Sequence, residues 1–366
     1  MWSEHGLGRH RSGQTSRRDA DWRDRDGRTP KLVIFGRVDE TTAHCVKTAL
    51  LIDPEPVVRV RFWGVRGSVP TPGPGTVVYG GNTSCVEVRA DGRIIILDAG
   101  TGIRPLGMAL TKEFGDRAMD LTLLITHTHW DHIQGFPFFQ PAYDPKNTVR
   151  ILGYEGARRG LLATLSSQME SPFFPIGLLQ MPGNIRVEEL KDLQFNLDRI
   201  RVQAARMNHP GVTMGYRLTT RAGAVAFLPD NEPCLRLKTQ AARPAKVDTE
   251  VVVSARAQDQ KIVEFVRDAE VVIMDAQYDC EEYARHVGWG HGCVDDVVAL
   301  ALAARVKRLV LFHHDPEHDD DRVARLLVRA REQVAAQGGG MEVEAAREGL
   351  EITLHSAARP GGSAAY

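Results

Sequence analysis

The sequence predicts an α/β protein in which β-sheets are covered by outer helices. Two observations support this class. Between residues 57 and 228 the chain is rich in short apolar or alternating segments that are typical of strands. From residue 261 onward, helical and strand-like segments alternate. A chain that begins with strands and continues with alternating helices and strands suits sheets with helices packed on their outer faces.

Strands are expected where apolar or alternating runs lie between turn residues. One pair of strands is joined by Asp91-Gly92, which is typical of a tight hairpin turn. The expected strands are residues 58–62, 84–89, 94–97, 121–125, 149–152, 202–206, 214–218, 224–228, 271–274, 309–312, 343–345 and 350–354.

Helices are expected at 261–267, 294–305 and 320–337. Asp319 or Asp320 can cap the last of them, and the glycines at 338–340 end it. Residues 155–190 look helical and irregular, and they form either a lid over the site or part of the core. Residues 234–260 receive no assignment.

Composition is ordinary for a globular protein, because 43% of the 366 residues are hydrophobic and 25% are charged. The formal net charge of −1 creates no strong field toward nucleic acid or a membrane. No apolar run reaches the 18 residues that a membrane helix needs, and the N-terminus has no apolar signal core. A cytoplasmic protein without a membrane partner is therefore expected.

The chain divides into three parts. Residues 1–56 begin with a polar, arginine- and aspartate-rich stretch, and we expect a disordered or poorly defined extension there. Residues 57–355 would form the folded domain, and residues 356–366 a flexible tail. The five cysteines form no C-x-x-C pair, which favours free thiols in a reducing compartment that serve as small buried apolar groups.

The run Ile-Thr-His-Thr-His-Trp-Asp-His-Ile-Gln-Gly at 125–135 is the most informative part of the sequence. It places His127, His129, Asp131 and His132 directly after an apolar strand. Imidazole suits zinc, iron or nickel, and a carboxylate extends the choice to manganese. These donors exceed what one tetrahedral ion needs, so the run predicts two metal ions.

Three more donors follow predicted strands: His209, Asp230 and His313. Ligands delivered from several strand ends are rigid and converge on one rim. Each has a plainer interpretation, since His209 precedes Pro-Gly in a turn and Asp230 can cap a turn. His314 competes with His313, which we favour because it follows the apolar strand directly.

This constellation resembles the signature of the metallo-β-lactamase superfamily over roughly residues 57–355. The resemblance implies an αββα sandwich, with two mixed β-sheets packed face to face between outer helices. It also implies a ligand set of three groups: His127, His129 and His209 for the first metal, Asp131, His132 and His313 for the second, and Asp230 as the bridge between them.

A second motif, Gly288-Trp289-Gly290-His291-Gly292-Cys293, leads into the predicted helix at 294. It resembles the Gly-His-Ser/Thr segment of the phosphodiesterase branch, which includes tRNA 3′-processing endonucleases and cyclic phosphodiesterases. In that branch the histidine assists at the scissile phosphate, which implies a catalytic role for His291. The plainer interpretation is a histidine hydrogen-bonded in a turn. Cys293 replaces the usual Ser or Thr, which removes the usual hydrogen bond at the helix start.

The expected activity is metal-dependent hydrolysis of a phosphodiester. Two metal ions about 3.5 to 4 Å apart lower the pKa of a shared water toward neutrality. Asp131 would orient or deprotonate that water and His291 would assist the departing oxygen, while Asp98 is expected to orient a metal-binding histidine. Zinc is the expected metal, with manganese or iron as alternatives.

A small or cyclic nucleotide-like substrate is favoured, because the sequence shows neither a tRNA-binding arm nor a strongly basic stripe. An RNA or DNA nuclease of the same fold stays open as an alternative. A thioester or lactam hydrolase is less favoured, because of His291 and Asp131. A non-catalytic metal-binding sensor and a homodimer also stay open.

Overall fold

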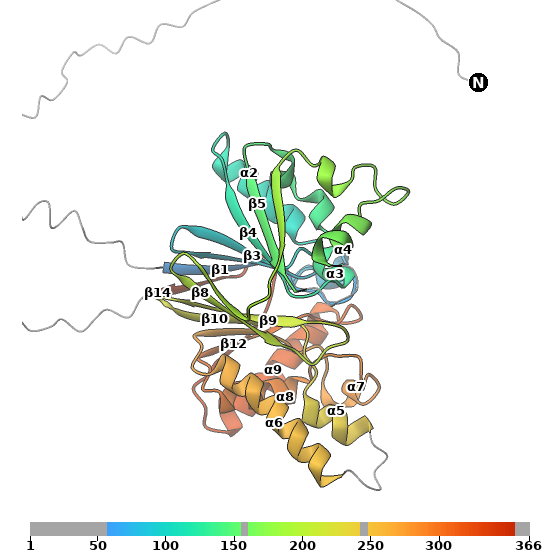
Figure 1. Ribbon diagram of the computed structural model, residues 1–366. Coiled ribbons are helices and arrows are strands. Elements are labelled where there is room, and N and C mark those ends of the chain that lie inside the picture. Colours follow the sequence, from blue (N-terminus) through green and yellow to red (C-terminus); the bar gives the residue numbers. More distant parts are fainter. Residues whose placement is uncertain (1–56, 155–159, 242–247, 356–366) are drawn as a thin grey trace, which may run out of the picture. The chain divides into compact units, whose positions relative to one another are not determined.

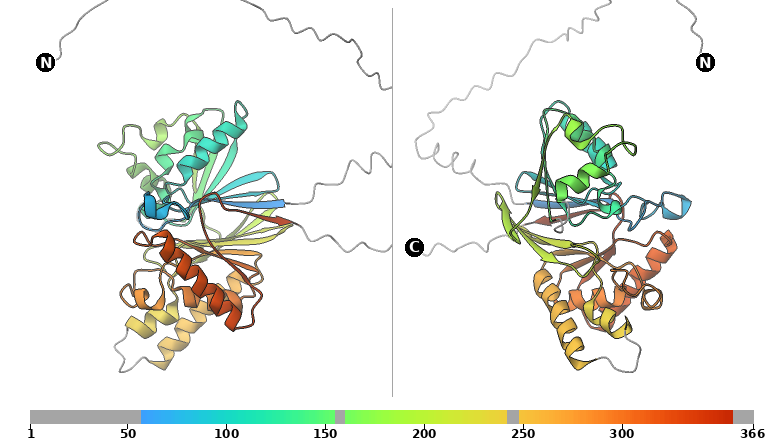
Figure 2. Two further views of the ribbon diagram at one scale, coloured as in Figure 1. Left: turned by 180° about the vertical axis from the view of Figure 1, so that it is seen from behind. Right: turned by 45° about the vertical axis from the view of Figure 1, so that its right-hand side comes forward.

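The computed structural model describes residues 57–154, 160–241 and 248–355. Within them, the strands form two seven-stranded sheets that pack face to face (Figures 1 and 2). One sheet has the order β14-β1-β2-β3-β4-β5-β6 and the other has the order β13-β12-β11-β10-β9-β8-β7. The predicted αββα arrangement of two mixed sheets is confirmed.

Every strand expected from the sequence is present. The strands are β1 (Val57–Gly64), β2 (Cys85–Ala90), β3 (Arg93–Leu97), β4 (Asp120–Ile125), β5 (Thr148–Gly153), β6 (Asn184–Glu189), β7 (Gln194–Leu197), β8 (Ile200–Arg206), β9 (Met214–Thr220), β10 (Gly223–Leu228), β11 (Val271–Asp275), β12 (Arg308–Phe312), β13 (Glu342–Ala345) and β14 (Glu351–His355).

Helices cover the outer faces of both sheets, with α2 and α4 on one side and α6, α8 and α9 on the other (Figures 1 and 2). The α-helices are α2 (Ile103–Phe114), α3 (Trp130–Ile133), α4 (Leu161–Ser167), α5 (Cys234–Ala241), α6 (Thr249–Val266), α7 (Cys280–Tyr283), α8 (Val294–Ala303) and α9 (Asp320–Ala336). The short 3-10 helices are η1 (Pro74–Thr76), η2 (Phe136–Phe138), η3 (Gln140–Tyr143) and η4 (Leu178–Gln180).

Each sheet is half antiparallel and half parallel. β3, β4, β5 and β6 run parallel in the first sheet, and β10, β11, β12 and β13 run parallel in the second. The carboxyl ends of parallel strands meet at one edge, so side chains that follow these strands are brought together. The predicted tight hairpin turn between β2 and β3 is confirmed, and its φ of 48° at Asp91 and 78° at Gly92 is typical of a type I′ turn.

Two of the expectations need correction. Residues 184–189 are not helical but form β6, because Ile185 and Val187 alternate with polar residues and β6 pairs along β5. Within the unassigned stretch 234–260, the described residues form α5 and most of α6, whose first turn is capped by the Asp248 carboxylate. The predicted extension (1–56) and tail (356–366) lie outside the described residues.

No helix in the described part of the chain is long and apolar enough to cross a membrane.

Aromatic side chains fill the space between the sheets. Phe312 of β12 is fully buried, and its ring centroid lies 6.2 Å from that of Phe62 in β1 and 5.4 Å from that of Phe227 in β10. Since interiors are close-packed, this contact ties the two sheets together directly behind the end of β12.

We expect Phe312→Ala to lower the free energy of unfolding by about 3 to 5 kcal/mol, because it removes buried apolar surface and leaves a cavity. Urea unfolding would measure the change. Phe173→Ala is the matched control, since Phe173 is 83% exposed and the same truncation should cost less than about 0.5 kcal/mol. Equal losses in the two variants would contradict this account of the core.

Candidate metal centre

The His-rich run occupies the carboxyl end of β4. His127 and His129 lie in the turn after the strand, and the single turn of α3 then carries Asp131 and His132. His129 is the extended residue just before α3, with φ of −64° and ψ of 151°. The change from extended to helical backbone directs all four side chains toward one region. His127 and His132 are almost fully buried.

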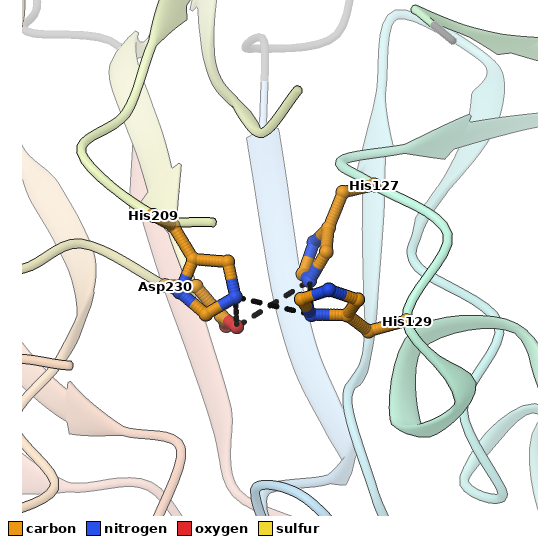
Figure 3. Close-up of side chains that lie close together, drawn as sticks. All are labelled: His127, His129, His209 and Asp230. Carbon is orange, nitrogen blue, oxygen red and sulfur yellow. Dashed lines mark hydrogen bonds and ion pairs between the residues drawn. The ribbon is translucent and has the colours of Figure 1, made fainter. Parts of the chain in front are cut away.

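The first donor set joins the two sheets (Figure 3). His127 and His129 come from the first sheet, and His209 follows β8 of the second. Nδ1 of His129 lies 2.9 Å from Nε2 of His127 and 3.1 Å from Nε2 of His209. These separations are close to the roughly 3.3 Å expected between two nitrogens on one tetrahedral zinc ion. With Asp230, the donor atoms lie within 4.8 Å of one another.

The second donor set consists of Asp131, His132 and His313. Nε2 of His313 lies 3.1 Å from Oδ2 of Asp131 and 3.3 Å from Nε2 of His132. All three residues are buried, and their donor atoms also lie within 4.8 Å of one another. The structure therefore brings together every residue that the sequence proposed for the second metal.

Asp230 lies between the two sets. Its Oδ2 is 3.5 Å from Nε2 of His127 and 3.3 Å from Nε2 of His209. Its Oδ1 is 3.3 Å from Nε2 of His132 and 3.2 Å from Nε2 of His313. One oxygen faces each set, which is the arrangement that a bridging carboxylate needs. The carboxylate is almost fully buried, and Oδ1 has no hydrogen-bond partner.

Hydrogen bonds fix the rings so that one nitrogen faces the centre. Asp98 Oδ2 lies 2.7 Å from Nδ1 of His132, which supports the expectation that Asp98 orients a histidine. Nδ1 of His209 donates to the carbonyl oxygen of Gly290 at 2.8 Å. Nδ1 of His313 lies 3.3 Å from Oε1 of Gln277. Such outer contacts fix the tautomer and leave the other nitrogen free to bind a metal.

The two neighbouring histidines after β12 point in different directions. His313 has φ of 61°, and this left-handed residue turns its ring into the centre. The His314 ring points away, and its Nε2 donates to the carbonyl oxygen of Ala346 at 2.8 Å. Burial lowers the pKa of His314 to about 3, so the ring stays neutral. The geometry favours His313, and not His314, as the metal-binding residue.

The loop after β1 approaches the centre closely. A Cβ atom on Gly67 would lie 2.4 Å from the His313 ring, so only glycine fits there. The next residue, Ser68, donates its backbone N–H to Oδ2 of Asp131 at 2.7 Å. Arg66 is fully buried and donates from Nη1 to the carbonyl oxygens of Asp315, at 3.1 Å, and His318, at 2.6 Å. These contacts hold the loop after β12 in place.

His291 lies beside both donor sets, and its side chain is buried. Its ring centroid is 5.1 Å from that of His313 and 5.2 Å from that of His209. A donor atom of His291 lies within 4.8 Å of those of Asp230 and His313. Nδ1 is 3.0 Å from Oδ2 of Asp275. The interpretation of His291 as a simple turn residue therefore does not account for its position.

Glu232 fixes the loop that carries His291. This buried carboxylate accepts hydrogen bonds from the backbone N–H groups of Gly288, at 2.8 Å, and Gly290, at 3.0 Å. It also accepts a hydrogen bond from the Tyr283 hydroxyl group at 2.5 Å. Cys293, which directly precedes the next helix, α8, makes no side-chain hydrogen bond to the start of that helix, as expected from the missing Ser or Thr.

Asp275, Gln277 and Glu232 were missed in the sequence. Asp275 is the last residue of β11, so the strand-end argument that selected Asp230 and His313 could have found it. Gln277 follows two residues later. Glu232 carried no such signal, because its role depends on a loop more than 50 residues away in the chain.

The charge balance of the centre fits a bound cation. Burial alone would lower the pKa of His132, but Asp131, Asp230 and Asp98 outweigh it and raise that pKa well above the ordinary value. Three buried carboxylates around one imidazole thus require positive charge. Burial lowers the pKa of His127 well below its ordinary value, which keeps this ring neutral and able to bind a metal.

The fold and this donor set define a metal-dependent hydrolase of the metallo-β-lactamase fold. A model of the beta-lactamase superfamily domain matches residues 93–314, and the chain belongs to this family.

Known relatives agree with this assignment. The chain is 23% identical over 314 residues to ribonuclease Z of Thermoplasma acidophilum, with 75% of this chain and 92% of that protein covered. The metallo-β-lactamase-fold protein YhfI of Bacillus subtilis superposes with a TM-score of 0.56 at 14% identity, covering 82% of this chain and 100% of YhfI. A diphosphatase from the PhnP family superposes with a TM-score of 0.52 at 15% identity, covering 81% and 97%. At these identities the two structures show that the fold is shared.

Substitution of the adjacent histidines should separate their roles. We expect His313→Ala to lose about one of two metal ions per chain, because it removes a donor from the second set. His314→Ala should keep both ions and lower the free energy of unfolding by about 2 to 3 kcal/mol, because it leaves a cavity and an unpaired carbonyl. Elemental analysis and urea unfolding measure the two effects. Loss of metal from His314→Ala alone would reverse the assignment.

The pH dependence of turnover should depend on Asp275. Burial alone would lower the pKa of His291, but the carboxylates of Asp275, first of all, and of Asp230 and Asp131 outweigh it and raise that pKa to about 9. His291 is then protonated at neutral pH and loses its proton as the pH rises. In Asp275→Asn the pKa should fall, and the alkaline limb of kcat/KM should move down by about one pH unit or more.

The matched control is Asp116→Asn, which changes an exposed carboxylate after α2 and should leave the profile unchanged. An unshifted alkaline limb in Asp275→Asn, with metal content intact, would show that this limb does not report His291.

Proposed function

We propose that the protein is a dinuclear metal-dependent phosphodiesterase that acts on a small or cyclic nucleotide-like substrate. One observation carries the proposal: the two oxygens of Asp230 face two separate donor sets, and His291, paired with Asp275, lies beside both. This arrangement supports two cation sites with a separate proton donor beside them.

The first set would hold one ion through three imidazoles, and the second would hold another through two imidazoles and Asp131. Zinc suits such a nitrogen-rich set, and the carboxylates leave manganese or iron as alternatives. When bound, two such ions lower the pKa of a shared water and neutralise charge that builds up on phosphate oxygens. The orphaned Oδ1 of Asp230 supports this occupancy.

Asp131 and His291 would act on opposite sides of the scissile bond. Ser68 N–H holds one oxygen of Asp131 in place, so this carboxylate is oriented before substrate arrives. It would orient the attacking water or accept its proton. His291, charged through Asp275, would donate a proton to the departing oxygen. Its role as donor depends on the proton at Nε2, since Nδ1 faces Asp275.

A pocket beside the centre suits a small substrate. Its volume is ≈ 660 Å³, within the usual range for small-molecule sites, and Ser68 and Gln277 connect it to the metal-binding residues. Trp289, which is 60% exposed, lines it and offers a face for a nucleobase. The charged residues that line it are of mixed sign, so shape and the Trp289 ring, more than net charge, would select the substrate.

A ribonuclease is the second candidate, and the similarity to ribonuclease Z of Thermoplasma acidophilum favours it. This alternative predicts binding to RNA that weakens steeply with salt, because phosphate contacts release counterions. A small-molecule phosphodiesterase predicts little such dependence.

Metal analysis combined with substrate turnover tests the proposal. We expect about two metal ions per chain and metal-dependent hydrolysis of bis(p-nitrophenyl) phosphate and of at least one cyclic nucleotide. A tRNA precursor with a 3′ trailer is the comparison substrate, and its preferred cleavage would favour the ribonuclease. Full metal occupancy without turnover of any of these substrates would favour a metal-binding sensor. Undiminished activity in Asp131→Ala would contradict the dinuclear mechanism.

His291→Asn should lower kcat by roughly 10² to 10⁴, because it removes a general acid, while the metal content stays near two ions per chain. The matched control is His355→Asn, since His355 is an exposed histidine at the end of β14. Steady-state kinetics and elemental analysis give the two readouts. Loss of a metal ion from His291→Asn would instead identify His291 as a ligand.

A further inference from the structure

Two thiols meet next to the loop that carries His291. Cys280 begins α7 and Cys293 directly precedes α8, and their Sγ atoms lie 3.3 Å apart. The backbone around them is paired, because Tyr278 N–H donates to Gly292 O at 3.1 Å and Val294 N–H donates to Tyr278 O at 2.8 Å. The contact is therefore a property of the fold and not of two side chains that happen to swing together.

The described cysteines are free thiols, as expected, but this contact shows that two of them are more than small buried apolar groups. Cys85 and Cys234 are buried without a thiol neighbour among the described residues, but Cys280 and Cys293 form a pair. Thirteen positions separate them in the sequence, so no C-x-x-C signature could reveal them.

We propose that Cys280 and Cys293 are a redox-active dithiol, and that its oxidation to a disulfide by a hydroperoxide displaces His291 and switches off hydrolysis. The bond requires the sulfurs to approach by about 1.3 Å, since a disulfide is about 2.05 Å long. The cross-link itself is independent of the proposed function, and its effect on hydrolysis rests on that function.

The chemistry balances with a hydroperoxide as the only oxidant. Cys280 is the partly exposed member, so its sulfur attacks the peroxide oxygen, becomes a sulfenic acid and releases water or an alcohol. The fully buried Cys293 sulfur then attacks the Cys280 sulfur, forms the S–S bond and expels the hydroxyl group as water. Two thiols lose two electrons and two protons in total, and the peroxide gains them.

Asp295 is placed to assist both steps. Its Oδ2 accepts a hydrogen bond from the Cys280 thiol at 2.9 Å and lies 3.6 Å from the Cys293 sulfur. The carboxylate orients the thiols, and each thiol proton leaves with the oxygen that is expelled, as water or an alcohol. Burial raises the pKa of both thiols, which keeps the pair reduced and slow to react until the oxidant is in excess.

The same three residues could instead hold a soft metal ion, since their donor atoms lie within 4.8 Å of one another. The charge balance favours the dithiol. The Arg329 guanidinium already neutralises Asp295, with Nε 2.9 and 3.1 Å from its two oxygens. The described residues supply no fourth donor to this cluster, whereas a structural zinc site has four protein ligands.

Formation of the disulfide would move Cys293, and a short, hydrogen-bonded segment would transmit this displacement to His291. Cys293 is two residues from His291, and Oδ2 of Asp275 accepts hydrogen bonds from both the His291 ring and Gly292 N–H, each at 3.0 Å. Glu232 holds Gly288 and Gly290 in place, so this part of the loop cannot absorb a movement of Cys293, and the movement reaches His291. A displacement of about 1 Å at a catalytic group can cost about 10²-fold in rate.

The test treats the full-length, metal-loaded protein with hydrogen peroxide. Peptide mapping should find a Cys280–Cys293 cross-link, and turnover of bis(p-nitrophenyl) phosphate should fall at least about ten-fold and recover with dithiothreitol. Metal content should not change. Cys280→Ser should keep its activity in peroxide, and Cys234→Ser, the matched control, should respond as the unaltered protein does.

Three results would overturn the proposal: no cross-link in excess peroxide, a cross-link with unchanged turnover, or a further metal ion that Cys280→Ser loses. If the reduced protein shows no phosphodiesterase activity, the proposed function fails but the dithiol is still tested by peptide mapping. Hydrogen exchange of residues 286–292 then provides the second readout, since the cross-link should change protection of this loop. Unchanged exchange in the cross-linked protein would contradict the coupling to His291.

Discussion

The buried carboxylate of Asp230 is the interaction on which the rest of the centre depends. It lies at the end of β10, where the edges of both sheets meet, and it faces four imidazole nitrogens at 3.2 to 3.5 Å. A buried charge is costly unless opposite charge compensates for it. The nearby histidines lower the pKa of Asp230 far below its ordinary value although burial acts to raise it. Cation binding and the junction of the two sheets are therefore linked.

The other donors reach this point because both sheets have parallel halves that end at the same edge. β4 supplies His127 and His129, β10 supplies Asp230 and β12 supplies His313. Strand ends within a sheet are fixed by their pairing, and hydrogen bonds to Asp98, Gly290 and Gln277 then orient the rings. The backbone is demanding both at the end of β12, where His313 has φ of 61°, and in the loop before His291, where Gly290 has φ of 91° and a Cβ would lie 2.3 Å from the His209 ring.

The sequence allowed much of this to be predicted, because strand periodicity and strand ends are local signals. Those signals yielded the strands other than β6 and β7 and singled out the seven candidate ligands, whose division between two metals came from the family resemblance. What could not be predicted depends on contacts between distant segments. β6 is a strand because β5 offers it a parallel partner. Cys280 and Cys293 meet because Tyr278 and Cys293 form a bridge between their segments. The choice between His313 and His314 depended on one backbone angle that no side-chain pattern encodes.

The segment from the end of β11 to the start of α8 acts as one mechanical unit. Asp275 lies at its first end, the Cys pair closes it, and Glu232 fixes its middle through Gly288 and Gly290. The same segment also contacts two of the proposed ligands, through Gly290 O on His209 and Gln277 Oε1 on His313. The backbone of the proposed ligands is set mainly by the strand ends, whereas His291 is carried by this segment itself. A small change in the segment therefore acts first on His291, which makes this residue the natural point of control in the site.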